Sequence, residues 1–268
     1  LTKDGDLIDS LYSVQYSEQY PLEVAKDIYI SPSYIDNVFS EILTSSLLTN
    51  KEYKYSDLGF YLLKPILEEK INSKIDKYLT LNLYHKIETY RITYNPLKKF
   101  DTLLIVPTEN DNYFRKQLLK GHVHDQGAAL FGGIGLHAGL FSNGLDLMKL
   151  MQLYLDQGSY LDTQLYSKKT IKKFTNSPFL KSGNRRALIF DKPSVNIDEN
   201  GPSCQGISSL SYGHSGFTGT LLWGDPSTGI VYVFLSNARV YPDGNNTDLI
   251  KQNIRTDIQK IIYESIIN

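Results

Sequence analysis

The chain has 268 residues, of which 41% are hydrophobic and 21% are charged, so it can bury a core and is not expected to be disordered. Its 28 basic and 29 acidic residues give a formal net charge of −1, which argues against nucleic acid or an anionic membrane surface as partner. The single cysteine, Cys204, excludes an intrachain disulfide and a cysteine-rich zinc site.

The N-terminal stretch LTKDGDLIDSLYS has no initiator Met, no basic leader and no apolar segment typical of a signal peptide. We therefore expect the chain to begin inside a longer polypeptide. No apolar run approaches the roughly 18 residues that a membrane span needs, so no transmembrane segment is expected.

Three helices are predicted in the first third of the chain. The first carries an apolar stripe over residues 35–43, the second begins at Ser56 or Asp57, and a third covers residues 75–90. Pro65 is expected to kink the second helix or cut it short. Residues 95–139 follow as a long irregular segment rich in Gly, Pro, His and Asp, and loops of that length are often functional.

The next predicted helix is capped by Ser142 or Asn143, carries apolar residues every three or four positions, and ends at Gly158. Beyond Pro178 the pattern changes to strands over residues 186–191, 210–216, 218–225 and 229–237, which predicts an antiparallel meander. A last helix, capped by Thr247, should lay one apolar face across that sheet. The isoleucines of this face are Ile250, Ile254, Ile258, Ile261 or Ile262, and Ile266.

Two short motifs carry candidate chemistry. Tyr55 and Asp57 flank Ser56 at the start of the second helix, where a phenol can exchange a proton and a carboxylate can hydrogen-bond a partner. Taken alone, this tripeptide is better explained by a tyrosine packed beside a helix N-cap.

The second motif lies at a predicted strand end. His214 would supply positive charge, Ser215 a hydrogen-bond donor, and Gly216 room for a substrate carbonyl. The amide of Phe217 would then form one arm of an oxyanion hole. Taken alone, His214 is better explained as an ordinary strand-end residue.

Together and in this order, the motifs resemble the serine β-lactamase and penicillin-binding superfamily, in its class C-like branch. The resemblance covers residues from about 50 to the end. It is carried by YSDLGFYLL, PTENDNYFRKQLLKGHVHDQGAA, GGIGLHAGLFSNGLDLMKLMQLYL and GHSGFTGTLLWGDP. The forms GHVHDQGAA and HAGLFS look most like the lactamase-type domain that Bacteroidota attach after a family 3 glycoside hydrolase domain.

The resemblance implies a role for each site residue. Tyr55 would shuttle the proton of the nucleophile, and Asp57 would replace the usual Asn. His214, Ser215 and Gly216 would replace Lys-Thr-Gly, and Phe217 would give the oxyanion donor. Because His214 carries charge only when protonated, β-lactam hydrolysis is in doubt, and esterase or peptidase chemistry stays open.

The family also needs a nucleophilic Ser-x-x-Lys, and no serine of this chain has Lys three residues later. Thr170 and Lys173 have the spacing, but they follow the Tyr motif and lie in a basic, exposed helix. The opening Leu-Thr-Lys has the form of the tail of such a motif but precedes no apolar stripe. We expect the nucleophile to lie upstream, outside the chain.

Other polar clusters are expected to be structural. His122, His124 and Asp125 lack a convincing metal-ligand set, and Glu109, Asp111 and Arg115 should form local ion pairs. His137 could line the cleft, but a structural hydrogen bond is the preferred expectation. No metal and no cofactor are predicted.

The sequence thus predicts an α+β, β-lactamase/transpeptidase-like fold with a helical region over residues 1–180, a sheet region over 181–268, and an active-site cleft between them. The predicted function is acyl-enzyme hydrolysis of an amide or ester by the parent protein in the periplasm or cell envelope, with this fragment inactive by itself. The alternative is a non-catalytic binding or scaffold module. Expected partners are a small-molecule or peptidoglycan-derived substrate and the upstream part of the protein. An exposed sheet edge would also allow the fragment to dimerise, which sedimentation can test.

Overall fold

The computed structural model describes residues 5–50, 53–196, 201–240 and 248–267. The contacts within the chain divide it into two compact units, which we describe separately. Unit 1 comprises the described residues up to Lys86 together with Ile92–Phe141, and unit 2 comprises Ile87–Arg91 and the residues from Ser142 onward. The boundary at residue 180 that the motifs predict falls inside unit 2, between its helix α6 (Lys168–Thr175) and its strand β10 (Tyr212–Ser215).

Unit 1 opens with a small antiparallel sheet in the order β1-β3-β2, formed by β1 (Tyr12–Ser13), β2 (Leu22–Ala25) and β3 (Ile28–Ile30). The tight turn between β2 and β3 places Asp27 in the left-handed region, at φ 58°. Buried side chains of this sheet form a core with residues that follow later in the chain. The core comprises Val24, Ala25, Ile28, Ile30, Phe114, Leu119, Val123, Ala128 and Ala129.

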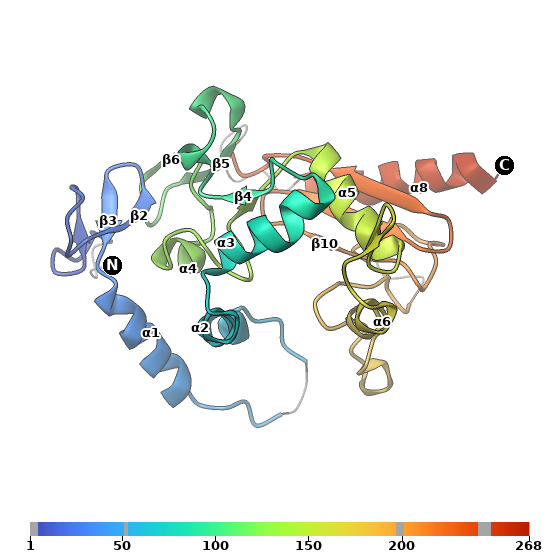
Figure 1. Ribbon diagram of the computed structural model, residues 1–268, viewed down its shortest axis with the longest axis horizontal. Coiled ribbons are helices and arrows are strands. Elements are labelled where there is room, and N and C mark those ends of the chain that lie inside the picture. Colours follow the sequence, from blue (N-terminus) through green and yellow to red (C-terminus); the bar gives the residue numbers. More distant parts are fainter. Residues whose placement is uncertain (1–4, 51–52, 197–200, 241–247, 268) are drawn as a thin grey trace. The chain divides into compact units, whose positions relative to one another are not determined.

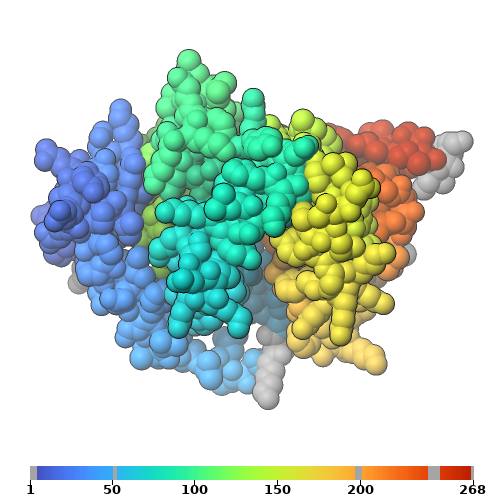
Figure 2. All heavy atoms as spheres, viewed as in Figure 1, coloured from blue at the N-terminus to red at the C-terminus, as the bar shows by residue number. Residues whose placement is uncertain are grey.

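The first helices of unit 1 are α1 (Ser33–Thr44), α2 (Leu58–Ile71) and α3 (Ile75–Leu79). Helix α3 is continued by a π turn over Thr80–Tyr84 and a 3-10 turn over His85–Ile87, whose last residue belongs to unit 2. Helix α2 is not cut short at Pro65, because a proline removes only one backbone donor, and it ends at Asn72 in the left-handed conformation, φ 48°. Figure 2 shows the same view with all heavy atoms as spheres, in which residues of α2 and α3, drawn in cyan, lie at the surface.

The segment 95–139, predicted to be irregular, contains short regular pieces. The hairpin β5 (Pro107–Asp111) and β6 (Gln117–Lys120) is followed by α4 (Gln126–Leu130). Strands β4 (Thr93–Tyr94) and β7 (Leu140–Phe141) pair with each other and bracket it. The segment is therefore a set of short elements joined by turns, all within unit 1 (Figure 1).

A buried ion pair closes the β5–β6 hairpin. Arg115 Nε donates to Asp111 Oδ2 at 2.6 Å, and both side chains are almost fully buried. Arg115 also donates to the carbonyls of Val123 and His124, while Asp111 accepts the amides of Tyr113, Phe114 and Arg115. Burial acts to raise the pKa of Asp111, but Arg115 and these amides outweigh it and lower that pKa.

Unit 2 has a central antiparallel sheet in the order β10-β11-β12, as the strand pattern predicts. Its strands are β10 (Tyr212–Ser215), β11 (Leu221–Asp225) and β12 (Ile230–Phe234), and the turn between the last two closes with Gly229 N donating to Asp225 O at 2.8 Å. The other elements are α5 (Gly144–Leu155), β8 (Ser159–Tyr160), β9 (Thr163–Gln164), α6 (Lys168–Thr175), α7 (Asp248–Lys251) and α8 (Ile254–Ile267).

Helices cover both faces of this sheet. Helix α5, capped by Asn143 as predicted, packs so closely on one face that a Cβ on Gly224 would lie 2.8 Å from Met151 Sδ. On the opposite face, Tyr263 of α8 donates to the buried Asp225 at 3.1 Å. Among the described strands β12 lies at the sheet edge. Dimerisation of the fragment stays a prediction.

One prediction for unit 2 is wrong. Residues 186–191 form no strand; only Asp191 pairs with Gly213 of β10, because the residues before it turn back through a bond from Ala187 N to Phe190 O. The apolar face predicted for the last helix is buried only in part: Ile262 packs against the core of the sheet, whereas Ile258, Ile261 and Ile266 are exposed.

Two polar contacts also hold α8 in place. Gln259, which is fully buried, accepts the Cys204 amide at 2.8 Å, and Tyr263 binds Asp225. Thr247 and the opening Leu-Thr-Lys lie outside the described residues. Within the described part of the chain, no helix has the length and apolarity that crossing a bilayer requires.

We expect Arg115→Met to lower the free energy of unfolding of unit 1 by about 3–5 kcal/mol, because it leaves the Asp111 carboxylate buried without its cation. Urea denaturation of the variant provides the measurement. Lys116→Met is the matched control: Lys116 is paired with Asp6 at 3.5 Å, both side chains are largely exposed, and the expected loss is below about 1 kcal/mol. Equal effects of the two substitutions would contradict a stabilising role of the buried Arg115–Asp111 ion pair.

Candidate active site

The strand β10 ends in an exposed edge that carries four of the predicted site residues. His214 is partly exposed, and Ser215, Gly216 and Phe217 are exposed. The turn after the strand is fixed by two backbone bonds: Gly216 N donates to Thr220 O at 2.8 Å, and Gly219 N donates to Gly216 O at 3.0 Å. Gly219 has φ +94°, and a Cβ there would lie 2.3 Å from Ser236 Oγ, so the turn requires glycine at this position.

This turn orients the peptide between Gly216 and Phe217. Because the Gly216 carbonyl points into the turn toward Gly219, the amide of Phe217, on the opposite side of the same trans peptide, points out of it. The Phe217 carbonyl accepts from Arg239 Nε at 3.2 Å, and the Arg239 guanidinium lies 4.1 Å from the center of the Phe217 ring. A fixed, outward-pointing amide is a group that can stabilise an oxyanion.

His214 is held by two neighbours. Its Nδ1 lies 2.7 Å from the carbonyl oxygen of Ser215, and its Nε2 lies 3.0 Å from Nη1 of Arg186. A guanidinium has donors only, so Nε2 is the acceptor of the second contact, and Nδ1, which faces a carbonyl, carries the proton. These two contacts therefore fit the tautomer with the proton on Nδ1.

Asp191 organises the segment beside β10. Its backbone pairs with Gly213, with Asp191 N donating to Gly213 O at 2.7 Å and Gly213 N donating to Asp191 O at 3.1 Å. Its Oδ2 accepts from Arg186 Nη2 at 3.0 Å and from Arg185 Nη2 at 3.2 Å, and Arg185 Nη2 also lies 3.0 Å from Oδ1. One carboxylate thus faces two guanidinium groups.

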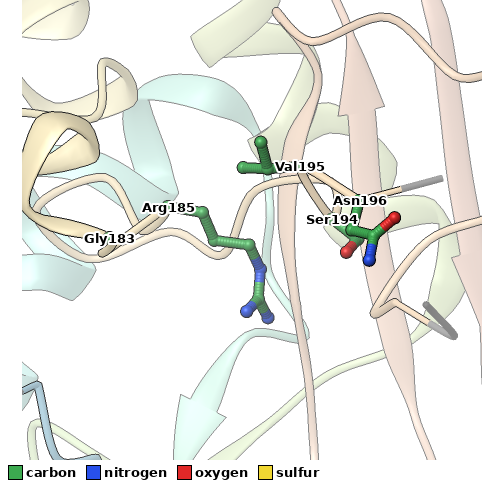
Figure 3. A pocket seen from close by; sticks show the side chains of 5 residues that line it. All are labelled: Gly183, Arg185, Ser194, Val195 and Asn196. Carbon is green, nitrogen blue, oxygen red and sulfur yellow. The ribbon is translucent and has the colours of Figure 1, made fainter. Parts of the chain in front are cut away.

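An open depression of about 480 Å³ lies on unit 2 near this cluster. Its lining residues are Gly183, Arg185, Ser194, Val195 and Asn196 (Figure 3). Arg185 lines this depression and also binds the Asp191 carboxylate. Its Nε donates to the carbonyl of Lys192 at 3.0 Å.

The other predicted motif lies in unit 1, at the start of α2. Ser56 Oγ accepts the Leu58 amide at 3.3 Å, and Asp57 occupies the N-cap position without a side-chain capping bond. Tyr55 is 58% exposed. The tyrosine and the carboxylate thus precede the helix as the sequence predicts.

A cluster of aromatic and charged side chains contacts α2 one turn after Asp57. The Tyr61 ring packs 4.7 Å from the His137 ring, and His137 Nε2 lies 2.9 Å from Asp125 Oδ1, which also accepts the Ala128 amide and so caps α4. Burial acts to raise the pKa of Asp125, but the bonds from His137 and Ala128 lower it overall. The structural role predicted for His137 is confirmed.

The remaining polar candidates serve separate structural purposes. His122 binds Glu23 at 3.2 Å, the His124 carbonyl accepts from Arg115, and Asp125 caps α4. In the described ranges no three His, Cys, Asp or Glu side chains are grouped as metal ligands. Burial raises the pKa of the Cys204 thiol to about 11, so a thiolate nucleophile is disfavoured there.

Comparison with known proteins identifies the family of this chain. The Beta-lactamase family model matches residues 25–253. The chain belongs to the beta-lactamase family. This confirms the resemblance predicted from the motifs and assigns the chain to a family of serine hydrolases.

Two curated relatives illustrate the similarity. A "Putative D-alanyl-D-alanine carboxypeptidase" of Escherichia coli (strain K12) is 34% identical over 199 residues, which cover 68% of this chain and 44% of that protein. An "N-acetylmuramyl-L-alanine amidase" of Bacillus subtilis (strain 168) is 32% identical over 211 residues, 72% of this chain and 46% of that protein. The chain thus spans less than half the length of either relative.

Solved structures confirm the β-lactamase-like α+β fold. A putative beta-lactamase from Bacteroides dorei superposes with a TM-score of 0.52 at 12% identity over 82% of this chain and 63% of its own. A penicillin-binding protein homolog from Caulobacter crescentus gives 0.51 at 14% identity, over 76% and 58%. At these identities the likeness concerns the fold.

Four of the six predicted site residues, His214 to Phe217, thus form one exposed strand end in unit 2, whereas Tyr55 and Asp57 lie in unit 1. Their catalytic roles stay predictions. The sequence reasoning missed Arg186 and Asp191, because the segment 186–191 was predicted to be an ordinary strand. The adjacent arginines, followed by an aspartate at the end of an apolar run, were the available signal.

A buried lysine beside this strand makes stability depend on pH. Lys192 is 7% exposed, and its Nζ donates to the Leu210 carbonyl at 3.0 Å. Burial lowers the pKa of Lys192 from 10.5 to about 8, although the charge of Asp225 acts in the opposite direction. Between these two values the unfolded chain binds more protons than the folded one, so stability increases with pH.

We expect the free energy of unfolding to gain about 1 kcal/mol from Lys192 between pH 7.5 and pH 9. Urea denaturation at both pH values, with Lys192→Met as the variant lacking this gain, provides the measurement. Lys181→Met, which changes an exposed lysine, should keep the gain in free energy of unfolding between the two pH values. If Lys192→Met shows the same pH dependence as the unsubstituted chain, the prediction is wrong.

Proposed function

We propose that this chain is the part of a serine acyl hydrolase that supplies the proton-transfer tyrosine and the oxyanion strand, acting on an amide or ester of D-alanyl peptide type. The observation that carries this proposal is the fixed, outward-pointing amide of Phe217 at the exposed end of β10. The names of the two curated relatives, a carboxypeptidase and an amidase, both describe cleavage of an amide bond.

In the proposed reaction a serine hydroxyl attacks the substrate carbonyl, and the Phe217 amide stabilises the resulting oxyanion. Tyr55 accepts the proton of the hydroxyl and passes it to the leaving amine as the carbon–nitrogen bond breaks. Water then cleaves the acyl ester. Asp57 orients the groups beside Tyr55, and the serine with its lysine comes from residues upstream of this chain.

The parent protein is proposed to work in the cell envelope, in the periplasm where one exists, on peptidoglycan-derived material. Its upstream portion would be the main partner of this chain, and a family 3 glycoside hydrolase domain is the proposed neighbour. By itself the chain is proposed to be inactive, because none of its serines is followed three residues later by Lys.

The test is covalent labelling with a fluorescent penicillin and a fluorophosphonate, on this chain and on a version extended upstream in its gene. Labelling of the extended version alone is the expected result. If neither version is labelled although both fold, the hydrolase proposal fails in favour of a non-catalytic binding or scaffold module.

A tyrosine pair provides a matched control in the extended version. Tyr55→Phe should slow acylation by roughly 10²–10⁴-fold, because the proton acceptor is lost. Tyr53→Phe removes a hydroxyl of similar exposure, 53% against 58%, two residues away, and should change the rate less than about threefold. Equal rates for the two variants would remove Tyr55 from the mechanism.

A further inference from the structure

A strongly basic segment lies in unit 2, between Asp162 and Asp191. Residues 163–190 include no acidic side chain and seven basic ones, which are Lys168, Lys169, Lys172, Lys173, Lys181, Arg185 and Arg186. With these seven set aside from the 28, the rest of the chain holds 21 basic side chains against 29 acidic ones, a net charge of −8. The overall charge of −1, which argued against an anionic surface as partner, therefore hides a concentrated positive region.

The five lysines of this segment are exposed, whereas the two arginines bind Asp191. Four of the lysines belong to α6, and the fifth, Lys181, belongs to the 3-10 turn Leu180–Ser182 that follows it in the chain (Figure 1). Among the described residues none of the five lysines takes part in an ion pair. Their charge is therefore presented to solvent.

This arrangement of lysines is unfavourable for a surface helix in water. Lys168 and Lys172 are four residues apart, and so are Lys169 and Lys173, so like charges face each other along α6 and destabilise it. Lys168 and Lys169 also occupy the first turn, where the helix dipole disfavours cations. No acidic residue lies one helical turn away to offset either effect. A nearby anionic surface would remove this cost.

Large apolar side chains accompany the lysines and are exposed as well. Phe174 at the end of α6 is 37% exposed, and Phe179 and Leu180 before Lys181 are 58% and 50% exposed. Ile171, in contrast, is 3% exposed and is the buried residue of α6. Lysines combined with exposed phenylalanine and leucine are typical of segments that bind at a membrane interface. A soluble polyanion would pair with the lysines but would gain little from these apolar groups.

We propose that the segment 167–181, which comprises α6 and the 3-10 turn after it, binds the surface of a membrane that contains anionic phospholipid. The lysines contact the headgroup phosphates, and Phe179 and Leu180 enter the boundary between headgroups and acyl chains. The contact is peripheral. The inference does not rest on the proposed hydrolase activity, because no residue of this segment belongs to the candidate active site.

The experiment measures binding of this chain to lipid vesicles by cosedimentation. One set of vesicles contains phosphatidylcholine alone, and the other contains about one third phosphatidylglycerol. We expect at least about tenfold tighter binding to the anionic vesicles in about 0.05 M salt, and loss of most of this preference in about 0.5 M salt, because salt screens the exposed lysines. Equal binding to both sets, or no binding to the anionic set, overturns the proposal.

A pair of lysine substitutions locates the binding surface. Lys169→Gln combined with Lys173→Gln should weaken binding to the anionic vesicles roughly 25-fold, since each lysine near such a surface contributes roughly fivefold in affinity. Because like charges are removed from α6, the melting temperature should not fall. Should this variant not fold, Lys172→Gln combined with Lys181→Gln replaces it with the same expected loss.

Lys70→Gln combined with Lys77→Gln is the matched control. These two lysines are exposed on α2 and α3, so the variant has the same change in net charge on helix surfaces outside the segment. Its binding should change less than about threefold. If the control pair weakens binding as much as the α6 pair does, binding follows the net charge of the chain, and the segment is not the site.

A last variant distinguishes a lipid surface from a soluble anionic polymer. Phe179→Ser should weaken vesicle binding about tenfold, because an aromatic ring no longer enters the interface, and should leave binding to dextran sulfate within about twofold. If Phe179→Ser leaves vesicle binding unchanged, while the α6 lysine pair weakens binding to vesicles and to dextran sulfate alike, the partner is an anionic polymer and the membrane proposal fails.

Discussion

The pairing of Asp191 with β10 is the constraint on which the candidate site depends. Its backbone forms two hydrogen bonds with Gly213, which fix the segment 185–192 against the outer edge of the sheet. Its carboxylate then holds Arg185 and Arg186, and Arg186 in turn holds His214. A single aspartate thus sets the position of a cation and the tautomer of a histidine on the neighbouring strand.

Gly213 also lets β10 lie close to β11. A Cβ at this position would lie 2.2 Å from the Leu222 carbonyl and 2.5 Å from the Trp223 ring, so only glycine lets β10 approach β11 this closely. On the face of the sheet that carries Trp223, Asp225 and Tyr263 hold α8 in place, and α5 packs on the other face at Gly224. The strand end therefore rests on a sheet that is fixed on both faces, which is the rigid support that an oxyanion donor needs.

Local patterns predicted most elements of unit 2 and the order of its motifs. Alternation of apolar residues identified β10 to β12, and Asn143 marked the start of α5. The errors arose where polar residues far apart in sequence decide the structure. On α8 the buried Gln259 binds the Cys204 amide across 55 residues beside Ile262, and Arg186 reaches His214 across 28 residues. Hydrophobic periodicity does not encode such contacts.

The central claim is that the Phe217 amide is the oxyanion donor of the proposed acyl-transfer site. A crystal structure of the upstream-extended protein acylated by benzylpenicillin tests it most directly. We predict that the ester carbonyl oxygen lies about 2.7–3.1 Å from the Phe217 nitrogen. An ester carbonyl directed away from Phe217 would contradict the account.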